Sequence, residues 1–560
     1  MQHYSGTGAS VLVSCLRSLG LKRIFGVPGE SFISVLNEMR DVSDLEFILT
    51  RHEGGASMMA DAEAKLTGRP GMLMLARGPG AANAMAGLHI ASQDSTPLIA
   101  FVGLIPRKFS GREAFQEINV PHFFGDVAKW AVTVDDPQRL PEIIMRAYST
   151  ACSGRPGPVV IGLPEDILTD TVEISASLPN PRISKSAPDA GQLREVVQAI
   201  DTSKKPLIIV GGSLWSDTSR KELERLSTAM TVPVATAFRC QDFFDNLHAG
   251  YAGHLGIGMD PDLRKLVKEA DYIIAIGARL DEHTTGSYTL INSPVPDQSL
   301  IHVHPSGEEL HKFCQAEIAV CCDPEQFVRV LGNEAETFMK GTKRADWYAR
   351  VGKVARAFRE PQPMPGDLQL PHVMDALSEL LSDDTVICNG AGNYAGWVHR
   401  YFPFRQHRTQ LAPTSGSMGY GLPAAIAAAL VHPDRRAIAV AGDGCLQMTI
   451  QELATAAAYK LPIIALVFNN QSHGAIRMHQ EISYPGRVYV TDLDNPDFVK
   501  LAKSYGWNAE KIYTTEEFLP AIKRAIASSG PAMIEFSLPV EALSAGASLS
   551  DIRARKRKTS

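Results

Sequence analysis

Short apolar runs of strand length alternate along this chain with longer stretches of helical character. The runs are rich in Ile, Val, Leu and Ala, and examples are Leu98–Val102, Leu207–Val210, Tyr272–Ile276 and Ala437–Val440. Continuous apolar runs of this length are typical of parallel strands that are buried on both faces. Their alternation with helical patterns predicts an α/β fold built from doubly wound parallel sheets.

Two proline-rich stretches, 178–188 and 360–366, interrupt this alternation and are the best linker candidates. They divide the chain into three parts of similar size, each with its own strand and helix patterns. We therefore predict three doubly wound domains at residues 1–170, 190–345 and 366–545. A basic tail at 546–560 follows, and we expect it to be solvated.

The first and third parts echo each other. Residues 140–164 have the pattern of a helix, a Gly-Pro turn, a buried strand and a Leu-Pro exit, and residues 519–539 have the same pattern. Gly-Pro and Leu-Pro are common in loops, so chance supplies part of such a match. The echo nevertheless predicts that the outer thirds use one supersecondary design twice.

Composition excludes several classes of protein. The chain has 560 residues, 45% hydrophobic and 21% charged, with a formal net charge of −6, which gives no indication of nucleic-acid binding. No apolar run reaches membrane-spanning length and no signal segment is evident, so we expect a cytoplasmic protein without a membrane. The 8 cysteines are scattered and predict neither a disulfide framework nor a zinc site.

The strongest chemical signal is Gly442-Asp443-Gly444, followed after 24 residues by Asn469-Asn470. Each group directly follows an apolar run, so both are expected at the carboxyl ends of neighbouring parallel strands, where open α/β sheets bind ligands. Asp443, Asn470 and the carbonyl of Ser472 would supply oxygen ligands for Mg²⁺, which usually takes few protein ligands together with phosphate oxygens. A bare Gly-Asp-Gly is more often an ordinary turn, and only the Asn pair at this interval favours the metal site.

With these residues the chain resembles the thiamine diphosphate (ThDP) dependent enzymes, and most closely their acetolactate synthase (large, catalytic subunit) branch. The resemblance implies a pyrimidine-binding domain, a middle domain and a diphosphate-binding domain. It also implies that glycine-rich strand ends, an apolar wedge between the cofactor rings and the residues after the Asn pair bind the cofactor. The cofactor-binding residues implied are Gly392, Asn393, Tyr394, Gly416, Met418, Gly442, Asp443, Gly444, Cys445, Asn470, Ser472, His473 and Gly474. For Cys445, a small buried hydrophobe is the alternative.

Glu53 is the expected catalytic acid-base residue. It lies in Arg51–Gly55, between a predicted strand and a helix expected from about Ala56 to Leu66, and on its own it would simply complement the helix dipole. By the resemblance, its carboxyl group would bind the aminopyrimidine and promote the imino tautomer that removes the proton from the thiazolium C2. Burial would strengthen that hydrogen bond and raise the pKa of the carboxyl group.

Several further segments resemble the acetolactate synthase branch, namely 114–117, 128–130, 157–164, 277–286 and 447–455. The resemblance implies that Phe115, Gln116 and Lys129 line the substrate side, although a surface lysine is more often only solvated.

Three residues bear on the choice of substrate. Glu30 replaces a glycine of the synthases. It would shuttle protons or discourage an anionic acceptor, or it is only a glutamate in a first helical turn. His479 replaces a tryptophan of the acceptor pocket, and Arg477 would pair with a substrate carboxylate.

The middle third leaves its ligand open. Arg279 and His254 resemble FAD contacts of the biosynthetic synthases, but Ile301–Pro305 lacks the acidic strand end that would bind a ribose hydroxyl. FAD, ADP, CoA and no ligand all stay open.

We therefore predict a ThDP- and Mg²⁺-dependent lyase or transferase that decarboxylates a small 2-oxo acid, with pyruvate as donor, and joins the two-carbon unit to an acceptor. The alternatives are a 2-oxo acid decarboxylase, a lyase acting on 2-hydroxy ketones or 2-hydroxyacyl-CoA, and a non-catalytic cofactor-binding homologue. The resemblance implies a homodimer or homotetramer with active sites at the subunit interface, and leaves open whether a regulatory subunit is needed.

Overall fold

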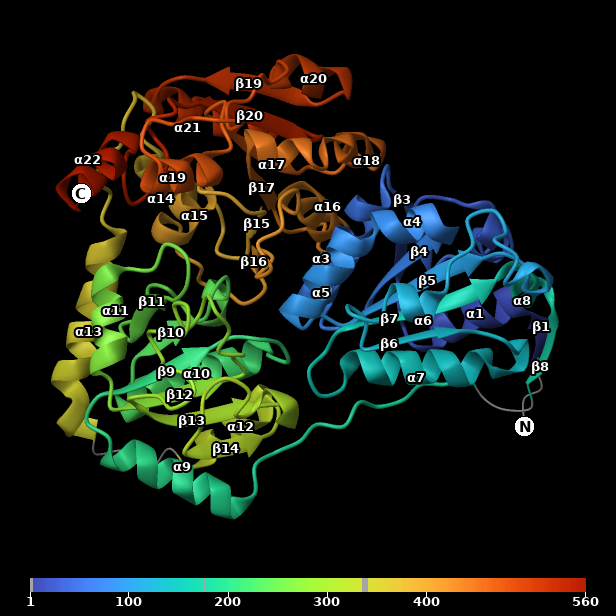
Figure 1. The fold of residues 1–560 in the computed structure, drawn as a ribbon, viewed down its shortest axis with the longest axis horizontal. Helices are drawn as coiled ribbons and strands as arrows, with labels where there is room; N and C mark the ends of the chain where they lie inside the picture. The colour runs from blue at the N-terminus through green and yellow to red at the C-terminus, as the bar shows by residue number, and fades with distance from the viewer. Residues whose placement is uncertain (1–3, 175–177, 335–340, 560) are drawn as a thin grey trace. The chain divides into compact units, whose positions relative to one another are not determined.

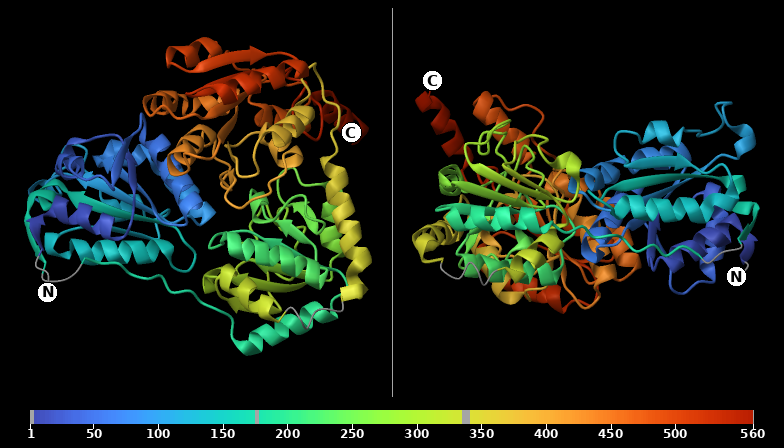
Figure 2. Two further views of the ribbon diagram at one scale, coloured as in Figure 1. Left: turned by 180° about the vertical axis from the view of Figure 1, so that it is seen from behind. Right: turned by 90° about the horizontal axis from the view of Figure 1, so that it is seen from below.

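The computed structural model describes residues 4–174, 178–334 and 341–559. The chain forms two compact units. The first contains Met1–Ser184, Pro413–Asp434 and Met448–Ile463, and the second contains Lys185–Ala412, Arg435–Gln447 and Ile464–Ser560. Three six-stranded parallel sheets organise the described residues, and helices lie on both sides of the sheets (Figures 1 and 2). The predicted fold class is confirmed, while the exact domain boundaries stay a prediction.

The N-terminal sheet has the strand order β3-β2-β4-β5-β7-β6. Its strands are β2 (Arg23–Gly26), β3 (Glu46–Leu49), β4 (Gly71–Ala76), β5 (Leu98–Leu104), β6 (Trp130–Thr133) and β7 (Pro158–Pro164). Its helices are α1 (Gly8–Ser18), α2 (Ile33–Arg40), α3 (Glu53–Thr67), α4 (Arg77–Asn83), α5 (Met85–Asp94), α6 (Val120–Phe123), α7 (Leu140–Cys152) and α8 (Glu165–Thr169). A separate antiparallel pair joins β1 (Tyr4–Thr7) to β8 (Thr171–Ile174).

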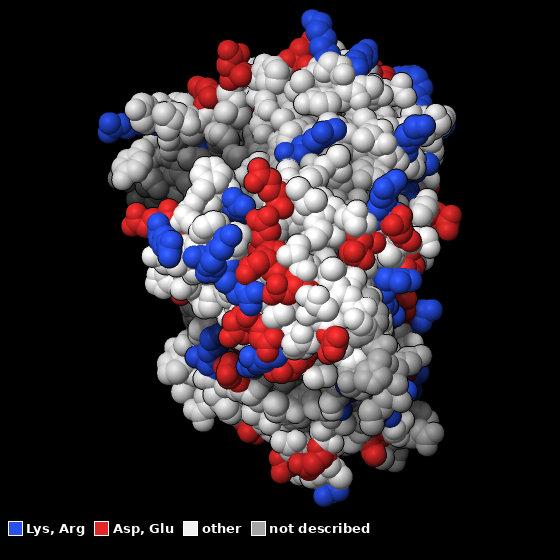
Figure 3. Space-filling view, turned by 90° about the vertical axis from the view of Figure 1, so that its right-hand side faces the viewer, with Lys and Arg blue, Asp and Glu red and all other residues white. Residues whose placement is uncertain are grey.

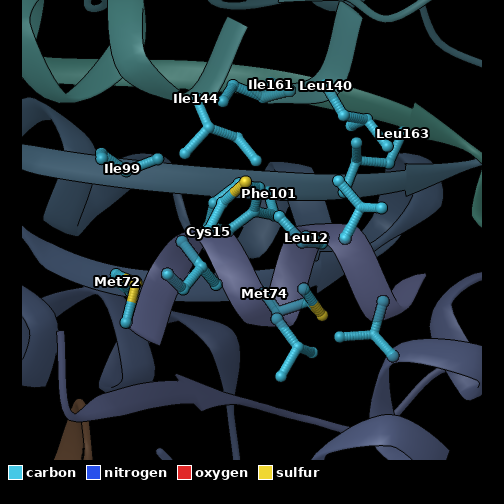
Figure 4. Close-up of a cluster of buried hydrophobic side chains, with 14 of the residues drawn as sticks. Leu12, Cys15, Met72, Met74, Ile99, Phe101, Leu140, Ile144, Ile161 and Leu163 are labelled. Atoms are coloured by element: carbon cyan, nitrogen blue, oxygen red, sulfur yellow. The ribbon is translucent and has the colours of Figure 1, made fainter. Parts of the chain in front are cut away.

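One hydrophobic core fills the space between α1, α7 and the central strands of this sheet. Leu12 and Cys15 of α1 meet side chains of β4 and β5, and Ile144 of α7 closes the cluster (Figure 4). Strand β5 is buried along its whole length. This explains why its sequence shows no polar alternation.

The middle sheet has the order β11-β10-β9-β12-β13-β14. This is the doubly wound order in which the chain reverses direction across the sheet beside its first strand, here between β9 and β12. Its strands are β9 (Pro206–Val210), β10 (Val234–Thr236), β11 (Tyr251–His254), β12 (Tyr272–Ile276), β13 (Ser299–His304) and β14 (Ile318–Cys321). Its helices are α9 (Ala190–Thr202), α10 (Asp217–Met230), α11 (Pro261–Glu269), α12 (Pro324–Asn333) and α13 (Ala345–Arg359).

The C-terminal sheet has the order β16-β15-β17-β18-β20-β19. Its strands are β15 (Val386–Asn389), β16 (Gln410–Leu411), β17 (Ala437–Gly442), β18 (Ile464–Asn469), β19 (Asn508–Ile512) and β20 (Ala532–Ser537). The helices of the second unit around it are α14 (Leu370–Leu380), α15 (Ala395–Tyr401), α17 (Asp443–Gln447), α19 (Gly474–Ser483), α20 (Phe498–Ser504), α21 (Thr515–Ala527) and α22 (Leu549–Thr559).

Counted from its first strand, the C-terminal sheet has the same order as the N-terminal sheet: second, first, third, fourth, sixth, fifth. The helix-strand pairs α7–β7 and α21–β20 occupy equivalent positions in the two orders. The internal echo predicted from the sequence is therefore confirmed at the level of topology.

Two helices from the last third of the sequence belong to the first unit. They are α16 (Gly421–Val431), which packs against α3, and α18 (Leu453–Ala458). The sequence placed both segments in the C-terminal domain.

The predicted basic tail is only partly a tail. It begins as α22, where Leu549 and Ile552 are buried in a small apolar cluster and the Arg553 guanidinium binds the Glu481 carboxylate at 2.7 and 2.8 Å. The expectation of a solvated tail is wrong for these residues because the apolar side chains anchor the helix.

The last features of the fold are its surface charge and the length and polarity of its helices. Acidic and basic side chains lie close together on the face shown in Figure 3 rather than forming a field of one sign. None of the helices in residues 4–174, 178–334 and 341–559 is both long and apolar enough to cross a bilayer.

Candidate active site

Asp443 carries a buried negative charge at the carboxyl end of β17. It is 3% exposed, and its carboxylate accepts hydrogen bonds from the Gly444 amide at 2.9 Å and from Asn495 Nδ2 at 2.8 Å. Burial raises the pKa of this carboxyl group, and the hydrogen bonds oppose the shift. No Lys, Arg or His of the described residues forms a salt bridge with Asp443, so the site has a negative charge but no protein cation to balance it.

Both glycines around Asp443 are required by close packing. A Cβ on Gly442 would lie 2.8 Å from the Tyr394 ring, and one on Gly444 would lie 2.8 Å from His473 Cε1. The Tyr394 hydroxyl lies 3.1 Å from Cys445 Sγ, and both residues are buried. Tyr394 and Cys445 thus support the turn from within the domain, and their predicted contact with the cofactor stays a prediction.

The segment after β18 forms a compact loop beside Asp443. The Ser472 amide donates to Asn470 Oδ1 at 3.2 Å, and the Ser472 carbonyl accepts from the Gly474 amide at 2.8 Å. The His473 amide donates to the Thr491 carbonyl at 2.8 Å, which fixes the loop to the following segment. The loop therefore presents an amide oxygen and a carbonyl oxygen near the strand end.

The two members of the Asn pair have different positions. Asn469 is buried; its Nδ2 donates to Glu535 at 2.8 Å, and its Oδ1 accepts from Asn495 at 3.2 Å. Lys511 Nζ completes this network, 2.8 Å from Glu535. Asn469 thus holds the loop, whereas Asn470 is only partly buried. The sequence reasoning missed Asn495, which links Asp443 to Asn469.

The oxygen set fits Mg²⁺ better than a softer metal. In the part of the chain that the structure describes, no three His, Cys, Asp or Glu side chains cluster as a metal site would require. One carboxylate, one amide oxygen and one carbonyl oxygen are suited to a hard cation that also binds phosphate oxygens.

The Gly392–Tyr394 segment reaches the same region from β15. Asn393 Nδ2 donates to the carbonyls of Leu543 at 3.1 Å and Gly474 at 3.3 Å. Gly392 has φ +146°, a conformation that favours glycine. Asn393 therefore joins the two strand ends, as expected for residues of one site.

Glu53 belongs to the first unit and is the first residue of α3, three residues earlier than the predicted helix start. The His52 ring caps the helix by accepting from the Gly54 amide at 2.9 Å. The Glu53 carboxylate accepts from Asn83 Nδ2 at 3.0 Å, and Gly80 lies directly against it, since a Cβ there would be 3.2 Å from Oε1. Helix α4 therefore positions the carboxylate.

Glu452, which the sequence reasoning did not single out, holds the turn before Glu53. Its carboxylate is fully buried and accepts from the Arg51 amide at 3.2 Å and from the Thr455 hydroxyl at 2.6 Å. A Cβ on Gly55 would lie 2.5 Å from Glu452 Oε1, so only glycine fits at this position. Burial raises the pKa of Glu452.

The segment with Gly416 and Met418 also lies in the first unit. Gly416 is exposed with φ +71° and nothing within 4 Å of a Cβ, and Met418 is half-buried. Tyr420, two residues on, donates to Asp61 of α3 at 2.6 Å, and Lys65 pairs with Asp61 at 2.8 Å. A buried polar network thus fixes the Gly416–Met418 segment to the helix that begins at Glu53.

Three of the predicted substrate-side residues, Phe115, Gln116 and Glu30, lie near helix α4. The Gln116 carbonyl accepts from the Gly78 amide of α4 at 3.0 Å, and Phe115 beside it is 75% exposed. Glu30 is exposed and lies 3.9 Å from Arg77. Gln116 and Glu30 thus lie around the helix that positions Glu53.

Lys129 lies apart from Gln116 and Glu30 in the N-terminal sheet. It precedes β6 at the amino edge of the parallel sheet, opposite to the edge where Glu30 lies. Its Nζ donates to the carbonyls of Thr150 at 2.6 Å and Ser153 at 2.8 Å, at the end of α7. The lysine charge thus caps the end of α7 in this structure, and its predicted place on the substrate side stays a prediction.

Arg477 is likewise engaged within the fold. It is 7% exposed and pairs with Glu481 at 3.1 Å and Asp492 at 3.2 Å, so it is not available to a substrate carboxylate as predicted. His479, in the same helix, is exposed, and its role in the acceptor pocket stays a prediction.

Arg279 and His254, the two predicted nucleotide contacts of the middle domain, have different surroundings. Arg279 lies 3.6 Å from Glu309 near the strand ends. His254 lines a cavity of only 20 Å³ together with Gln241 and His399, and burial lowers the pKa of its ring to about 4. Such a cavity holds at most one water molecule, and the contact of His254 with a nucleotide stays a prediction.

Comparison with known proteins identifies three domain models along the chain. They are the N-terminal TPP binding domain (residues 6–123), the central domain (193–331) and the C-terminal TPP binding domain (390–536) of thiamine pyrophosphate enzymes.

The chain is also similar to curated proteins over nearly its full length. It is 32% identical to the acetolactate synthase large subunit of Corynebacterium glutamicum, over 98% of this chain and 90% of that protein. It is 32% identical to the probable acetolactate synthase large subunit of Methanocaldococcus jannaschii, over 96% and 93%. The acetolactate synthase isozyme 3 large subunit of Escherichia coli is 30% identical, over 89% and 88%.

Proposed function

The chain belongs to the family of thiamine pyrophosphate enzymes that includes the acetolactate synthase large subunits, and we propose that it decarboxylates pyruvate and joins the two-carbon unit to an acceptor. The observation that carries this proposal is the buried Asp443 carboxylate, which lies at a strand end beside two neutral oxygen ligands without a cation from the protein. A divalent ion bound there would neutralise Asp443 and hold a diphosphate.

The residues divide into two half-sites. In the second unit, Asp443, Asn470 and the Ser472 carbonyl would hold Mg²⁺, and Gly392, Asn393, His473 and Gly474 would surround the diphosphate. In the first unit, Glu53 would bind the aminopyrimidine ring and Met418 would separate the two rings. When bound, thiamine diphosphate supplies the electron sink for decarboxylation. Glu53 holds or moves a proton at a ring nitrogen, and Asn83 keeps its carboxylate oriented.

A homodimer is the smallest competent form in this proposal, because the family resemblance implies that Glu53 of one subunit serves a cofactor whose diphosphate is held by Asp443 of its partner. The relatives are called large subunits, so a regulatory partner is also part of the proposal. For the middle domain, FAD, ADP, CoA and no ligand all stay open.

A product assay tests the reaction. The purified protein, loaded with thiamine diphosphate and Mg²⁺, should convert pyruvate to acetolactate. Acetaldehyde as the only product would favour a simple decarboxylase, and no turnover with any 2-oxo acid would overturn the proposal. An absorbance spectrum of the purified protein shows directly whether it contains a flavin.

Asp443→Asn tests the metal site independently of turnover. The variant should lose Mg²⁺-dependent binding of thiamine diphosphate, measured by titration calorimetry, because an amide cannot neutralise the cation. Asp497→Asn is the matched control, since that exposed carboxylate caps α20 and pairs with Lys500. Equal binding by Asp443→Asn and the native protein would exclude Asp443 as a ligand.

A further inference from the structure

Arg77 has an unusual backbone conformation at a functional edge of the N-terminal sheet. It directly follows β4, at the carboxyl edge where open α/β sheets bind ligands. Its φ is +46°, in the left-handed region that a bulky side chain rarely adopts. Strain of this kind is retained mainly where function requires it.

The Arg77 guanidinium is nearly buried but poorly paired. The side chain is 13% exposed, and its NH2 lies 3.3 Å from Glu165 and 3.9 Å from Glu30. Its Nε is buried and has no hydrogen-bond partner among the described residues. A guanidinium has five N–H donors, so most of its capacity is unused.

Arg107 of the same domain serves as a comparison, because its guanidinium is engaged within the fold. Its Nε donates to Asp166 at 2.8 Å, one terminal nitrogen donates to the Asp135 carbonyl at 2.8 Å, and the other pairs with Asp170. Each of the three guanidinium nitrogens of Arg107 thus has a partner, although the side chain is more exposed than that of Arg77, at 38% against 13%. The shortage of partners at Arg77 is therefore not a general feature of arginines in this domain.

Helix α4 connects Arg77 to Glu53 and Gln116 of the predicted reaction site. Arg77 is its first residue, and Asn83 at its end donates to Glu53 at 3.0 Å. Between them, the Gly78 amide binds the Gln116 carbonyl and Gly80 packs against the Glu53 carboxylate. One seven-residue helix therefore fixes the arginine relative to the catalytic carboxylate and to Gln116.

We propose that Arg77 binds the carboxylate of the 2-oxo acid substrate. A planar guanidinium with unused donors matches a carboxylate in a bidentate arrangement. Glu30 is 83% exposed and Glu165 41% exposed, so both carboxylates can swing into solvent when the substrate takes their place. This inference rests on the proposed function and names the residue that selects anionic substrates.

The experiment compares Arg77→Asn with the native enzyme, since asparagine removes the charge but tolerates a positive φ. The KM for pyruvate should rise about 10- to 100-fold, as expected for loss of a charge-assisted bidentate contact. The concentration of thiamine diphosphate at half-saturation should not change. Inhibition by methyl pyruvate, an ester that keeps the 2-oxo group but has no charge, should also stay the same.

Arg77→Lys keeps the charge without the planar fork and should give an intermediate KM. It also keeps the test valid if the asparagine variant folds poorly. Arg139→Asn is the control, because that exposed arginine pairs with the exposed carboxylates of Glu142 and Asp135.

The outcomes separate the two proposals. A pyruvate KM within twofold of the native value in Arg77→Asn overturns the role of Arg77. A raised requirement for thiamine diphosphate at unchanged KM also overturns it, because Arg77 would then serve the cofactor. A native enzyme that turns over no 2-oxo acid would instead refute the proposed function itself.

Discussion

Replacing Gly55 by alanine tests whether Glu452 holds the turn that carries Glu53. The new Cβ would lie 2.5 Å from Glu452 Oε1, 2.7 Å from Cδ and 2.9 Å from Cγ, all below the 3.4 Å of ordinary contact. Glu452 cannot move freely, because it is fully buried and accepts hydrogen bonds from the Arg51 amide and the Thr455 hydroxyl.

The expected energies favour a clear loss of stability. Overpacking costs about 1–3 kcal/mol, and weakening the bonds to the Glu452 carboxylate costs about 1.5–3 kcal/mol. Alanine in place of glycine inside a helix returns only about 1 kcal/mol. We expect a net loss of about 2 kcal/mol in the first unit, concentrated at the turn before α3.

Hydrogen exchange measured by mass spectrometry reports on this turn directly. The Arg51 amide of Gly55→Ala should exchange about 10- to 100-fold faster, since each 1.4 kcal/mol corresponds to a factor of ten. Gly530→Ala is the matched control, because nothing lies within 4 Å of a Cβ there. A Gly55→Ala variant with a higher melting temperature and unchanged Arg51 exchange would refute this reasoning.

Three further changes test other parts of the structure. Lys129→Met should lower the free energy of unfolding by about 1–2 kcal/mol, because the amine caps α7. The KM for pyruvate should stay constant. A changed KM would instead support a place for Lys129 on the substrate side. Pairing with Arg553 lowers the pKa of Glu481 from 4.5 to about 2. Its ionised form therefore stabilises the fold above pH 4.5 and this contribution is lost as the pH falls towards 2. Denaturant unfolding of Glu481→Gln should show a deficit at pH 7 that shrinks over this window, and a deficit independent of pH would contradict the assignment. Tyr420→Phe should destabilise the first unit by about 1–3 kcal/mol in a thermal melt, because it leaves the buried Asp61 without this donor; an unchanged melt would show that the bond contributes nothing.

The sequence predicted those parts of the site that depend on local pattern. Asp443 and Asn470 each follow an apolar run, and Glu53 lies between a strand and a helix, so strand ends and helix starts could be located without coordinates. The repeated design of the outer thirds was also visible, because turns and apolar runs recur in the same order.

Long-range contacts could not be predicted in this way. Glu452 is 401 residues from Arg51, and Tyr420 is 359 residues from Asp61. No periodicity links such positions. The chain order also placed α16 and α18 in the C-terminal domain, whereas packing assigns them to the first unit.

The surroundings of charged residues were the hardest part of the site to predict. A lysine or arginine in a familiar segment indicates charge, but not which edge of the sheet the charge lies on or whether a carboxylate already neutralises it. Lys129 lies at the amino edge, and Arg477 is engaged by Glu481. The sequence reasoning did not single out Arg77, because its positive φ and its missing partners appear only in the three-dimensional structure.

The rate at which the thiazolium C2 proton of bound thiamine diphosphate exchanges with solvent deuterium is the measurement that decides the central claim. In Glu53→Gln the cofactor and Mg²⁺ should still bind, since Asp443 and Asn470 are unchanged, but exchange should slow by at least about 100-fold because the ring nitrogen loses its acid-base partner. Exchange at the native rate in a cofactor-loaded Glu53→Gln enzyme would contradict the account.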